Sequence, residues 1–219
     1  ADERRPTADR LARPFDFEEL AADRGTGDAV GVRRLAIALV HHPVLDRAGA
    51  TVTSAVTNMD VHDLSRSART YGATDFFVTT PIEAQRTLVQ TILGHWIEGS
   101  SAKRIPTRKD ALEIVRVVPT LDAAIEALGG RAQVEVWVTA ARTEAGKESL
   151  PDYATARTSL RSDDPRTVLV VFGTSWGLVP ALVEAADARL PPITGTSGYN
   201  HLSVRAACAI TLDRLVGER

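Results

Sequence analysis

The segment 172–178, Phe-Gly-Thr-Ser-Trp-Gly-Leu, combines residue types that could bind a ligand. It follows the apolar run 167–172, which predicts a strand buried on both faces, and it precedes a predicted helix. Glycine lets the backbone approach a ligand closely, and the first turn of a helix offers unpaired N–H groups. The segment therefore predicts either a ligand-binding loop or a plain tight turn.

A second glycine-containing loop, 191–201, runs into the segment 202–215, which is apolar almost all round. Such a helix is buried in a core or in a subunit interface. Asn200, His201 and Ser203 stand at its start. These polar residues predict either ligand contacts or caps of the helix.

Two clusters of cations could bind phosphate. His62, Arg66 and Arg69 are spaced four and three apart, so they share one side of a helix predicted over 60–71, with Asp60 as its cap. This side is either a solvated face or a pair of guanidinium groups aimed at phosphate or at a polarised hydroxyl. A predicted charged loop could track a nucleic-acid backbone or do nothing specific. Its cations are Lys103, Arg104, Arg108 and Lys109.

Gly173 to Gly177 also reads G-x-S-x-G, the nucleophile elbow of α/β-hydrolases. Ser175 would be the nucleophile, and Asp187 and His201 follow in the order Ser, Asp, His. Only 44 residues (176–219) follow Ser175, and no His-Gly-Gly oxyanion loop precedes it. A serine hydrolase therefore stays as an alternative. The chain has no G-x-G-x-x-G before a first helix and no P-loop motif.

Strand and helix patterns alternate along the chain and predict an α/β fold with a mostly parallel sheet and helices on both faces. In such sheets, ligands bind beyond the carboxyl ends of the strands. Pro81 is expected in the first turn of the second helix. The predicted strands are 35–40, 75–79, 113–118, 133–139, 167–172 and 188–190, and the predicted helices are 60–71, 81–96, 121–128, 151–160, 179–186 and 201–216.

The composition is ordinary for a globular protein: 44% of the residues are apolar, 25% are charged, and the net charge is −2. We expect a flexible extension over 1–33 and one domain over 34–219. The single Cys208 excludes a disulfide framework, and adjacent His41 and His42 point to different faces of a strand, so no metal site is predicted. With no membrane-length apolar run and no signal pattern, we expect a cytoplasmic protein.

Five segments resemble a small bacterial group of SPOUT-class RNA methyltransferases, which in some bacteria occurs fused to the tRNA (guanine-N1)-methyltransferase. The similarity covers about residues 34–217, and Tyr-Asn-His-Leu-Ser-Val-Arg at 199–205 is its most specific part. The five segments are Ala38–Val44, Thr57–Asp63, Ala68–Gly72, Phe172–Leu178 and Tyr199–Ala206.

The resemblance implies a C-terminal trefoil knot, a homodimer joined through the C-terminal helix, and an RNA substrate, with tRNA favoured. It also implies that three loops bind S-adenosylmethionine. The second loop is one residue shorter than is usual in the class and lacks its Glu. Carried over by position, the cofactor-binding residues are Thr139, Ala140, Ala141, Phe172, Gly173, Thr174, Trp176, Gly177, Leu178, Ile193, Thr194, Gly195, His201, Leu202, Ser203 and Ala206, and Arg142 ends the first loop.

In the wider class an arginine of the early helix takes part in ribose 2′-O methylation. Counting back six residues from Gly72 places it at Arg66. Asp60 stands where that branch has Asn, and Asn200 and His201 stand in its polar stretch, where His201 replaces an Asn. Asp60, His62, Arg66 and Asn200 are therefore the predicted catalytic residues.

Arginine stays protonated, so Arg66 is expected to orient phosphate and to stabilise a developing alkoxide. His62, Asp60 or a substrate phosphate would take the proton, and His62 has the better-matched reference pKa. For a base nitrogen acceptor, Asp60 or Asp63 would be the base. The ribose oxygen is favoured, and a non-catalytic module that binds the cofactor or RNA remains a second alternative. The predicted RNA-binding residues are Arg69, Lys103, Arg104, Arg108 and Lys109.

Overall fold

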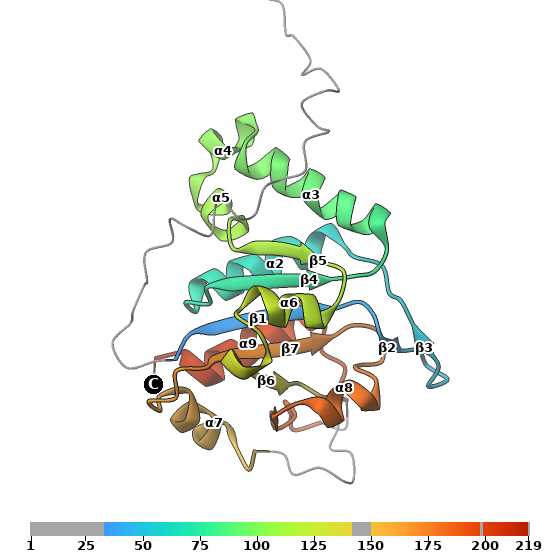
Figure 1. Ribbon diagram of the computed structural model, residues 1–219, viewed down its shortest axis with the longest axis vertical. Coiled ribbons are helices and arrows are strands. Elements are labelled where there is room, and N and C mark those ends of the chain that lie inside the picture. The colour runs from blue at the N-terminus through green and yellow to red at the C-terminus, as the bar shows by residue number, and fades with distance from the viewer. Residues whose placement is uncertain (1–32, 142–149, 198, 219) are drawn as a thin grey trace, which may run out of the picture. The chain divides into compact units, whose positions relative to one another are not determined.

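A six-stranded sheet forms the centre of the computed structural model, which describes residues 33–141, 150–197 and 199–218. Its strand order is β5-β4-β1-β7-β6-β8, and every pairing in it is parallel (Figure 1). The predicted α/β fold with a parallel sheet is confirmed. The strands are β1 (Leu35–Val40), β4 (Asp75–Thr79), β5 (Val115–Val118), β6 (Val134–Val138), β7 (Thr167–Gly173) and β8 (Ala188–Arg189).

Helices pack on both faces of this sheet, because its inner strands are apolar on both sides. Leu35, Ile37 and Leu39 of β1 belong to one cluster of buried side chains, and Ala36 and Ala38 belong to the other. Fully burying one large aliphatic side chain contributes about 1.5–3 kcal/mol. The first cluster includes side chains of α2 (Asn58–Thr70), α3 (Glu83–Ile97), α5 (Pro106–Leu112), α7 (Tyr153–Leu160) and α9 (Val204–Val216); the second includes α6 (Leu121–Ala127) and α8 (Pro180–Ala185).

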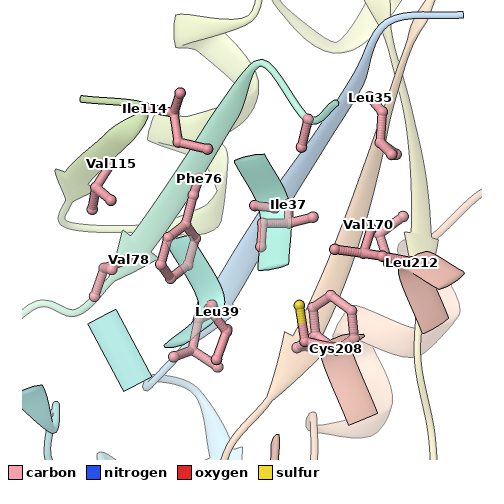
Figure 2. Packing of buried hydrophobic residues seen from close by; sticks show 14 of the residues in the cluster. Leu35, Ile37, Leu39, Phe76, Val78, Ile114, Val115, Val170, Cys208 and Leu212 are labelled. Atoms are coloured by element: carbon pink, nitrogen blue, oxygen red, sulfur yellow. The ribbon is translucent and has the colours of Figure 1, made fainter. Parts of the chain in front are cut away.

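The C-terminal helix α9 packs against the middle of the sheet. Figure 2 shows its Cys208 and Leu212 beside Ile37 of β1 and Val170 of β7. The other face of α9 is half-buried within the described residues. None of the helices in the described ranges is long and apolar enough to cross a membrane. The predicted knot concerns how the chain threads, which strand order alone does not fix, so it stays a prediction.

The carboxyl ends of all six strands lie at one edge of the sheet. Val40 of β1 pairs with Thr79 of β4 and with Gly173 of β7, and Val138 of β6 pairs with Arg189 of β8. The segments that follow these residues therefore leave the sheet side by side. A small antiparallel ribbon, β2 (Val44–Leu45) with β3 (Thr51–Val52), follows β1 at this edge.

Three local predictions are wrong in detail. Thr57, and not Asp60, caps α2: its hydroxyl oxygen accepts from the Asp60 amide at 3.1 Å and donates to the Asp60 carboxylate at 2.6 Å. Pro81 lies before α3, whose N-cap is Ile82. The cationic segment is helical, because Pro106 is tolerated at the start of α5 directly after α4 (Ser100–Arg104).

Helix α9 begins three residues later than predicted. The Ser203 hydroxyl accepts from the Ala206 amide at 3.2 Å and caps the helix, so His201 and Leu202 remain in the preceding loop. The predicted end of α2 is confirmed, since the chain turns at Gly72 with φ of 75° after the C-cap Tyr71.

Candidate active site

The loop after β7 is shaped by its glycines and held by backbone bonds. Gly177 has φ of 107°, and Ser175 also adopts a positive φ, of 53°. A Cβ atom on Gly173 would lie 2.8 Å from the Leu178 amide nitrogen. The Trp176 amide donates to the Leu45 carbonyl at 3.0 Å, and the Leu45 amide donates to the Gly177 carbonyl at 2.9 Å, which fixes the loop against β2.

The other two predicted cofactor loops lie against each other and against this one. Asn200 donates from Nδ2 to the Ala141 carbonyl at 2.8 Å, which joins the loop after β8 to the loop after β6. The His201 ring lies 6.5 Å from the Trp176 ring and 5.3 Å from the Tyr199 ring. The structure thus brings together at least one residue of each predicted loop: Ala141 of the first, Trp176 of the second, and Asn200 and His201 of the third. Arg142 lies outside the described residues.

The loop cluster offers backbone amides and apolar surface, the groups that bind an adenine ring. The amides of Ala140, Ala141, Thr194 and Leu202 donate to no other described residue, so they can bind the edge of an adenine. Trp176 and Leu202 are about half exposed, at 54% and 47%, and offer apolar surface to a flat base. In the described ranges, no three His, Cys, Asp or Glu side chains are grouped as metal ligands would be.

An ion-pair cluster joins the first turn of α2 to the first turn of α9. Arg205 Nη1 lies 3.0 Å from a carboxylate oxygen of buried Asp60, and its Nε lies 3.5 Å from the Asp63 carboxylate. With Thr57 on its other oxygen, Asp60 has both oxygens occupied. This arrangement orients Asp60 and weakens its case as a proton acceptor.

The sequence interpretation missed Arg205. The available signal is its position two residues after the Ser203 cap. A cation in the first turn of a helix is opposed by the positive end of the helix dipole, so it calls for an acidic partner. The partner cannot be identified locally, because Asp60 lies 145 residues away in the chain.

Arg66 is exposed on α2 between two surface cavities. Within the described residues, its guanidinium makes no hydrogen bond or ion pair, so it is available to an anion. The first cavity, of about 330 Å³, is lined by Arg66, Arg69, Thr70, Ile105, Thr107, Arg108 and Ala111. The second, of about 440 Å³, is lined by Asp63, Arg66, Ser67, Thr70, Tyr71, Arg205 and Ala209.

His62 packs edge-on against Trp96, with ring centroids 5.4 Å apart. Burial lowers the pKa of His62 below its usual 6.5, and the charges of Arg108 and Arg66 lower it further against the opposing charge of Asp63. The ring is therefore neutral near pH 7 and has one basic nitrogen that can take a proton.

The structure divides the four-cation segment. The Arg108 guanidinium stacks on the Trp96 ring, 4.6 Å from its centroid, and faces the same cavity as Arg66 and Arg69. Lys109 instead pairs with Glu113 at 3.5 Å, and Lys103 and Arg104 lie exposed on α4. Arg108 is thus the one member of the segment that lines the cavity beside Arg66.

The serine hydrolase alternative is not favoured. Asp187, its expected acid, accepts from Arg131 at 2.8 Å and from the Val136 amide at 2.6 Å. His201 packs on aromatic rings, and no hydrogen bond links it to Ser175 or Asp187 among the described residues. A nucleophile without a base in contact has no means of activation.

Residues 34–217 match the model of a protein family described as SAM-dependent RNA methyltransferase. A tRNA (guanine-N(1)-)-methyltransferase of Nitratidesulfovibrio vulgaris is 42% identical over 186 residues, which are 85% of this chain and 43% of the relative. An uncharacterized protein of Aquifex aeolicus is 39% identical over 182 residues, 82% of this chain and 86% of the relative. The chain spans less than half the length of the first of these relatives.

Solved structures share the fold at low sequence identity. TrmJ from Z. mobilis has a TM-score of 0.53 and 15% identity, covering 86% of this chain and 70% of its own. The SpoU methyltransferase AviRb from Streptomyces viridochromogenes has a TM-score of 0.50 and 17% identity, covering 86% of this chain and 62% of its own.

Proposed function

The chain belongs to a SPOUT-class family of SAM-dependent RNA methyltransferases, and from this premise we propose that it methylates tRNA, with a ribose 2′-oxygen as acceptor. The observation that carries the proposal is Arg66, whose guanidinium has no ion-pair or hydrogen-bond partner among the described residues and lies between two cavities. Arg66 stands on α2, which Arg205 of α9 joins through its ion pair with Asp60. The tRNA substrate is supported by the names of the curated relatives from two bacteria, both of which are tRNA methyltransferases.

S-adenosylmethionine supplies a methyl group already activated on a sulfonium, so the chain's own residues have to align the acceptor and remove its proton. The loops at 139–141, 172–178 and 192–203 bind the cofactor. Arg66 holds an RNA phosphate and stabilises negative charge on the acceptor oxygen. His62 takes the proton, because its ring is neutral, whereas both oxygens of Asp60 are engaged.

RNA binds along α2 and α5 through phosphate contacts. Arg66, Arg69 and Arg108 line one cavity, and no acidic side chain among the described residues pairs with any of them. Stacking on Trp96 holds Arg108 in place before RNA arrives, so less side-chain entropy is lost on binding. Lys103, Arg104 and Lys109 flank this cavity and contribute only weaker, longer-range attraction.

The proposal includes a homodimer joined through α9. This helix buries Cys208, Leu212 and Leu215 in the core, while Ala207 and Ile210 are half-buried. A second copy would cover that remaining apolar face. Light scattering on a sizing column should give twice the 23.5 kDa chain mass, and Ile210→Arg should shift the species toward the monomer.

The experiment that tests the function combines cofactor binding with product analysis. Purified protein is titrated with S-adenosylhomocysteine in a calorimeter, then incubated with S-adenosylmethionine and unmodified tRNA transcripts. Nucleoside mass spectrometry should detect a 2′-O-methyl nucleoside, whereas N1-methylguanosine would place the acceptor on a base. Binding without any methylated nucleoside would favour the non-catalytic module.

Arg66→Ala separates the acceptor side from the cofactor side. It should lower transfer about 10²–10³-fold, as loss of one charge-stabilising group does in other enzymes. The affinity for S-adenosylhomocysteine should change by less than about twofold, because Arg66 lies outside the three loops. A tenfold loss of cofactor affinity in this variant would contradict its assignment to the acceptor.

A further inference from the structure

His41 directly follows the central strand β1 and is completely buried, yet the proposed chemistry makes no use of it. Its Nδ1 lies 2.9 Å from the Ser54 hydroxyl oxygen. That oxygen lies 2.5 Å from the Thr174 hydroxyl oxygen, and Thr174 donates to the Val40 carbonyl at 3.0 Å. A chain of side-chain hydrogen bonds therefore leads from the strand to the loop after β7.

The hydrogens of this chain can be assigned from its fixed end. The Val40 carbonyl can only accept, so the Thr174 hydroxyl gives it its hydrogen. Thr174 then accepts from Ser54, and Ser54, with its hydrogen used, accepts from His41. His41 must therefore carry its proton on Nδ1: His41 donates to Ser54, Ser54 donates to Thr174 of the loop, and Thr174 donates back to the Val40 carbonyl at the end of β1.

Two further observations support this assignment. Burial lowers the pKa of His41 to about 4, against a smaller opposing effect of Asp60, so the ring is neutral and has a single N–H to give. Its Nε2 is buried without a hydrogen-bond partner among the described residues. A buried polar atom left unpaired is costly, so the histidine is explained by what its Nδ1 does.

The neighbouring residues form a comparable contact that leads elsewhere. Thr53 and His42 lie directly beside Ser54 and His41, and the Thr53 hydroxyl lies 2.9 Å from His42 Nδ1. Within the described residues, neither of them forms a hydrogen bond with the loop after β7. The chain thus contains an internal control: two adjacent hydroxyls that bond adjacent histidines, of which only Ser54 reaches Thr174.

We propose that His41 is a positioning residue for the methyl donor: through Ser54 it orients Thr174 and so fixes the cofactor-binding shape of the loop 172–178. The inference rests on the proposed function in taking this loop as part of the S-adenosylmethionine site. Losing one such hydrogen bond should weaken cofactor binding about 3–10-fold.

The test measures the dissociation constant of S-adenosylhomocysteine by calorimetry, which is independent of turnover. Ser54→Ala should weaken binding by that factor, and Thr53→Ala should leave it unchanged. Thr174→Val also removes the bond to the Val40 carbonyl, so it should weaken binding at least as much as Ser54→Ala. The double variant should bind no more weakly than Thr174→Val alone, because Ser54 acts only through Thr174. The affinity for tRNA should be unchanged in all four proteins.

Substitution of His41 tests whether its Nδ1 donates the first hydrogen bond of the series His41–Ser54–Thr174. Asparagine places an amide N–H near the position of Nδ1, whereas the longer glutamine carries its amide to the position of Nε2. His41→Asn should therefore retain most of the cofactor affinity, and His41→Gln should lose as much as Ser54→Ala, with thermal denaturation confirming that both fold. Equal affinity in the Ser54 and Thr53 variants would overturn the inference.

A further variant, Gly177→Val, distinguishes failure of the positioning role of His41 from failure of the proposed cofactor role of the loop. A β-branched residue at φ of 107° distorts the loop even when the hydrogen bonds from His41 to Ser54 and Thr174 are intact. If Gly177→Val binds S-adenosylhomocysteine as tightly as the wild type, the loop is not part of the cofactor site, and the inference falls with it. If Gly177→Val loses binding and Ser54→Ala does not, only the positioning role is refuted.

Discussion

The predicted cofactor loops differ in character from the α2 surface, which is the surface around Arg66, Arg69 and Arg108. The loops are held by backbone bonds, glycine conformations and neutral side chains, such as the bond from Asn200 to the Ala141 carbonyl. The α2 surface depends on charge instead. An ion pair between Asp60 and Arg205 joins α2 to α9, and Arg66 and Arg108 line a cavity. Under the proposed function, the shape of the loops would recognise a small cofactor, and guanidinium groups would recognise the phosphates of RNA.

This difference predicts different responses to salt and to substitution. At 0.1 M salt, exposed charges more than about 10 Å apart are largely screened from each other, whereas backbone hydrogen bonds in a shaped loop are hardly affected. RNA binding should therefore depend strongly on salt, and the affinity of the loops for the cofactor should not. Each of the following predictions separates the two regions or tests a residue that joins them.

The largest effect should come from His62, on the α2 side. His62→Gln should lower transfer about 10²–10⁴-fold through loss of the general base, and leave cofactor affinity unchanged. In the wild type, the lowered pKa keeps the ring neutral to a pH below 6.5, so the rate should fall only as the pH drops through that lower value. Rates of methyl transfer from about pH 4.5 to 8 at saturating substrates measure the loss of rate and its pH dependence. Calorimetry with S-adenosylhomocysteine measures the cofactor affinity.

Asp60 provides the contrast for this prediction. If Asp60 were the base instead, the fall of the rate at acidic pH would persist in His62→Gln. Asp60→Asn keeps the shape of the side chain and removes the charge, so it serves as the matched variant. A His62→Gln enzyme with an unchanged pH profile would rule out the histidine.

On the cofactor side, Gly177→Val should produce the next largest change. Forcing a side chain into this positive-φ conformation costs about 1–3 kcal/mol, which corresponds to about 5–150-fold in cofactor affinity if the loop deforms instead. Affinity for tRNA should be unchanged, as measured by filter binding. Loss of both activities would indicate misfolding, which circular dichroism would reveal.

How much of this arrangement the sequence predicts depends on whether the signal is local. The apolar runs at 35–40 and 167–172 predict buried strands correctly, because a strand with two covered faces has to be continuously apolar. The glycines of 172–178 likewise mark a loop whose backbone conformation they permit. In both cases the residues that form the feature also carry its signal, so the sequence alone locates it.

The rest depends on partners far apart in the chain. The local pattern predicts Asp60 as the cap of α2, but its role is to bind Arg205, 145 residues away. The four cations after Gly99 look alike in sequence, and only packing on Trp96 distinguishes Arg108 from Lys109, which pairs with Glu113. The two-residue strands β2 and β3 are too short to show any periodicity.

A smaller effect should distinguish the arginine cavity from its surroundings. Arg69→Ala with Arg108→Ala should weaken tRNA binding about 10-fold at low salt and reduce the salt slope by about 1.4–1.8, the value for two lost phosphate contacts. Lys103→Ala with Arg104→Ala removes the same charge from exposed positions on α4 and should change the slope by less than half as much. Equal slopes for the two double variants would mean that the cavity makes no specific phosphate contact.

Substitution of Arg205 should have the smallest effect, but it should affect both the cofactor loops and the α2 surface. The residue follows the third cofactor loop and binds Asp60 and Asp63 of α2, so its loss should loosen both sides of the site. Its side chain is 30% exposed, so solvent screening limits the contribution of the pair to about 1 kcal/mol. Arg205→Met retains the apolar stem without the charge and should lower the melting temperature by about 2–4 °C.

The same variant should weaken S-adenosylhomocysteine binding and transfer by similar factors of about 3–5, because one lost contact of about 1 kcal/mol is shared by both sides. Arg205→Lys keeps a charge near Asp60 but lacks the second donor toward Asp63, and should fall between the wild type and Arg205→Met. A variant that lowers transfer with no change in cofactor affinity would assign Arg205 to the acceptor side alone.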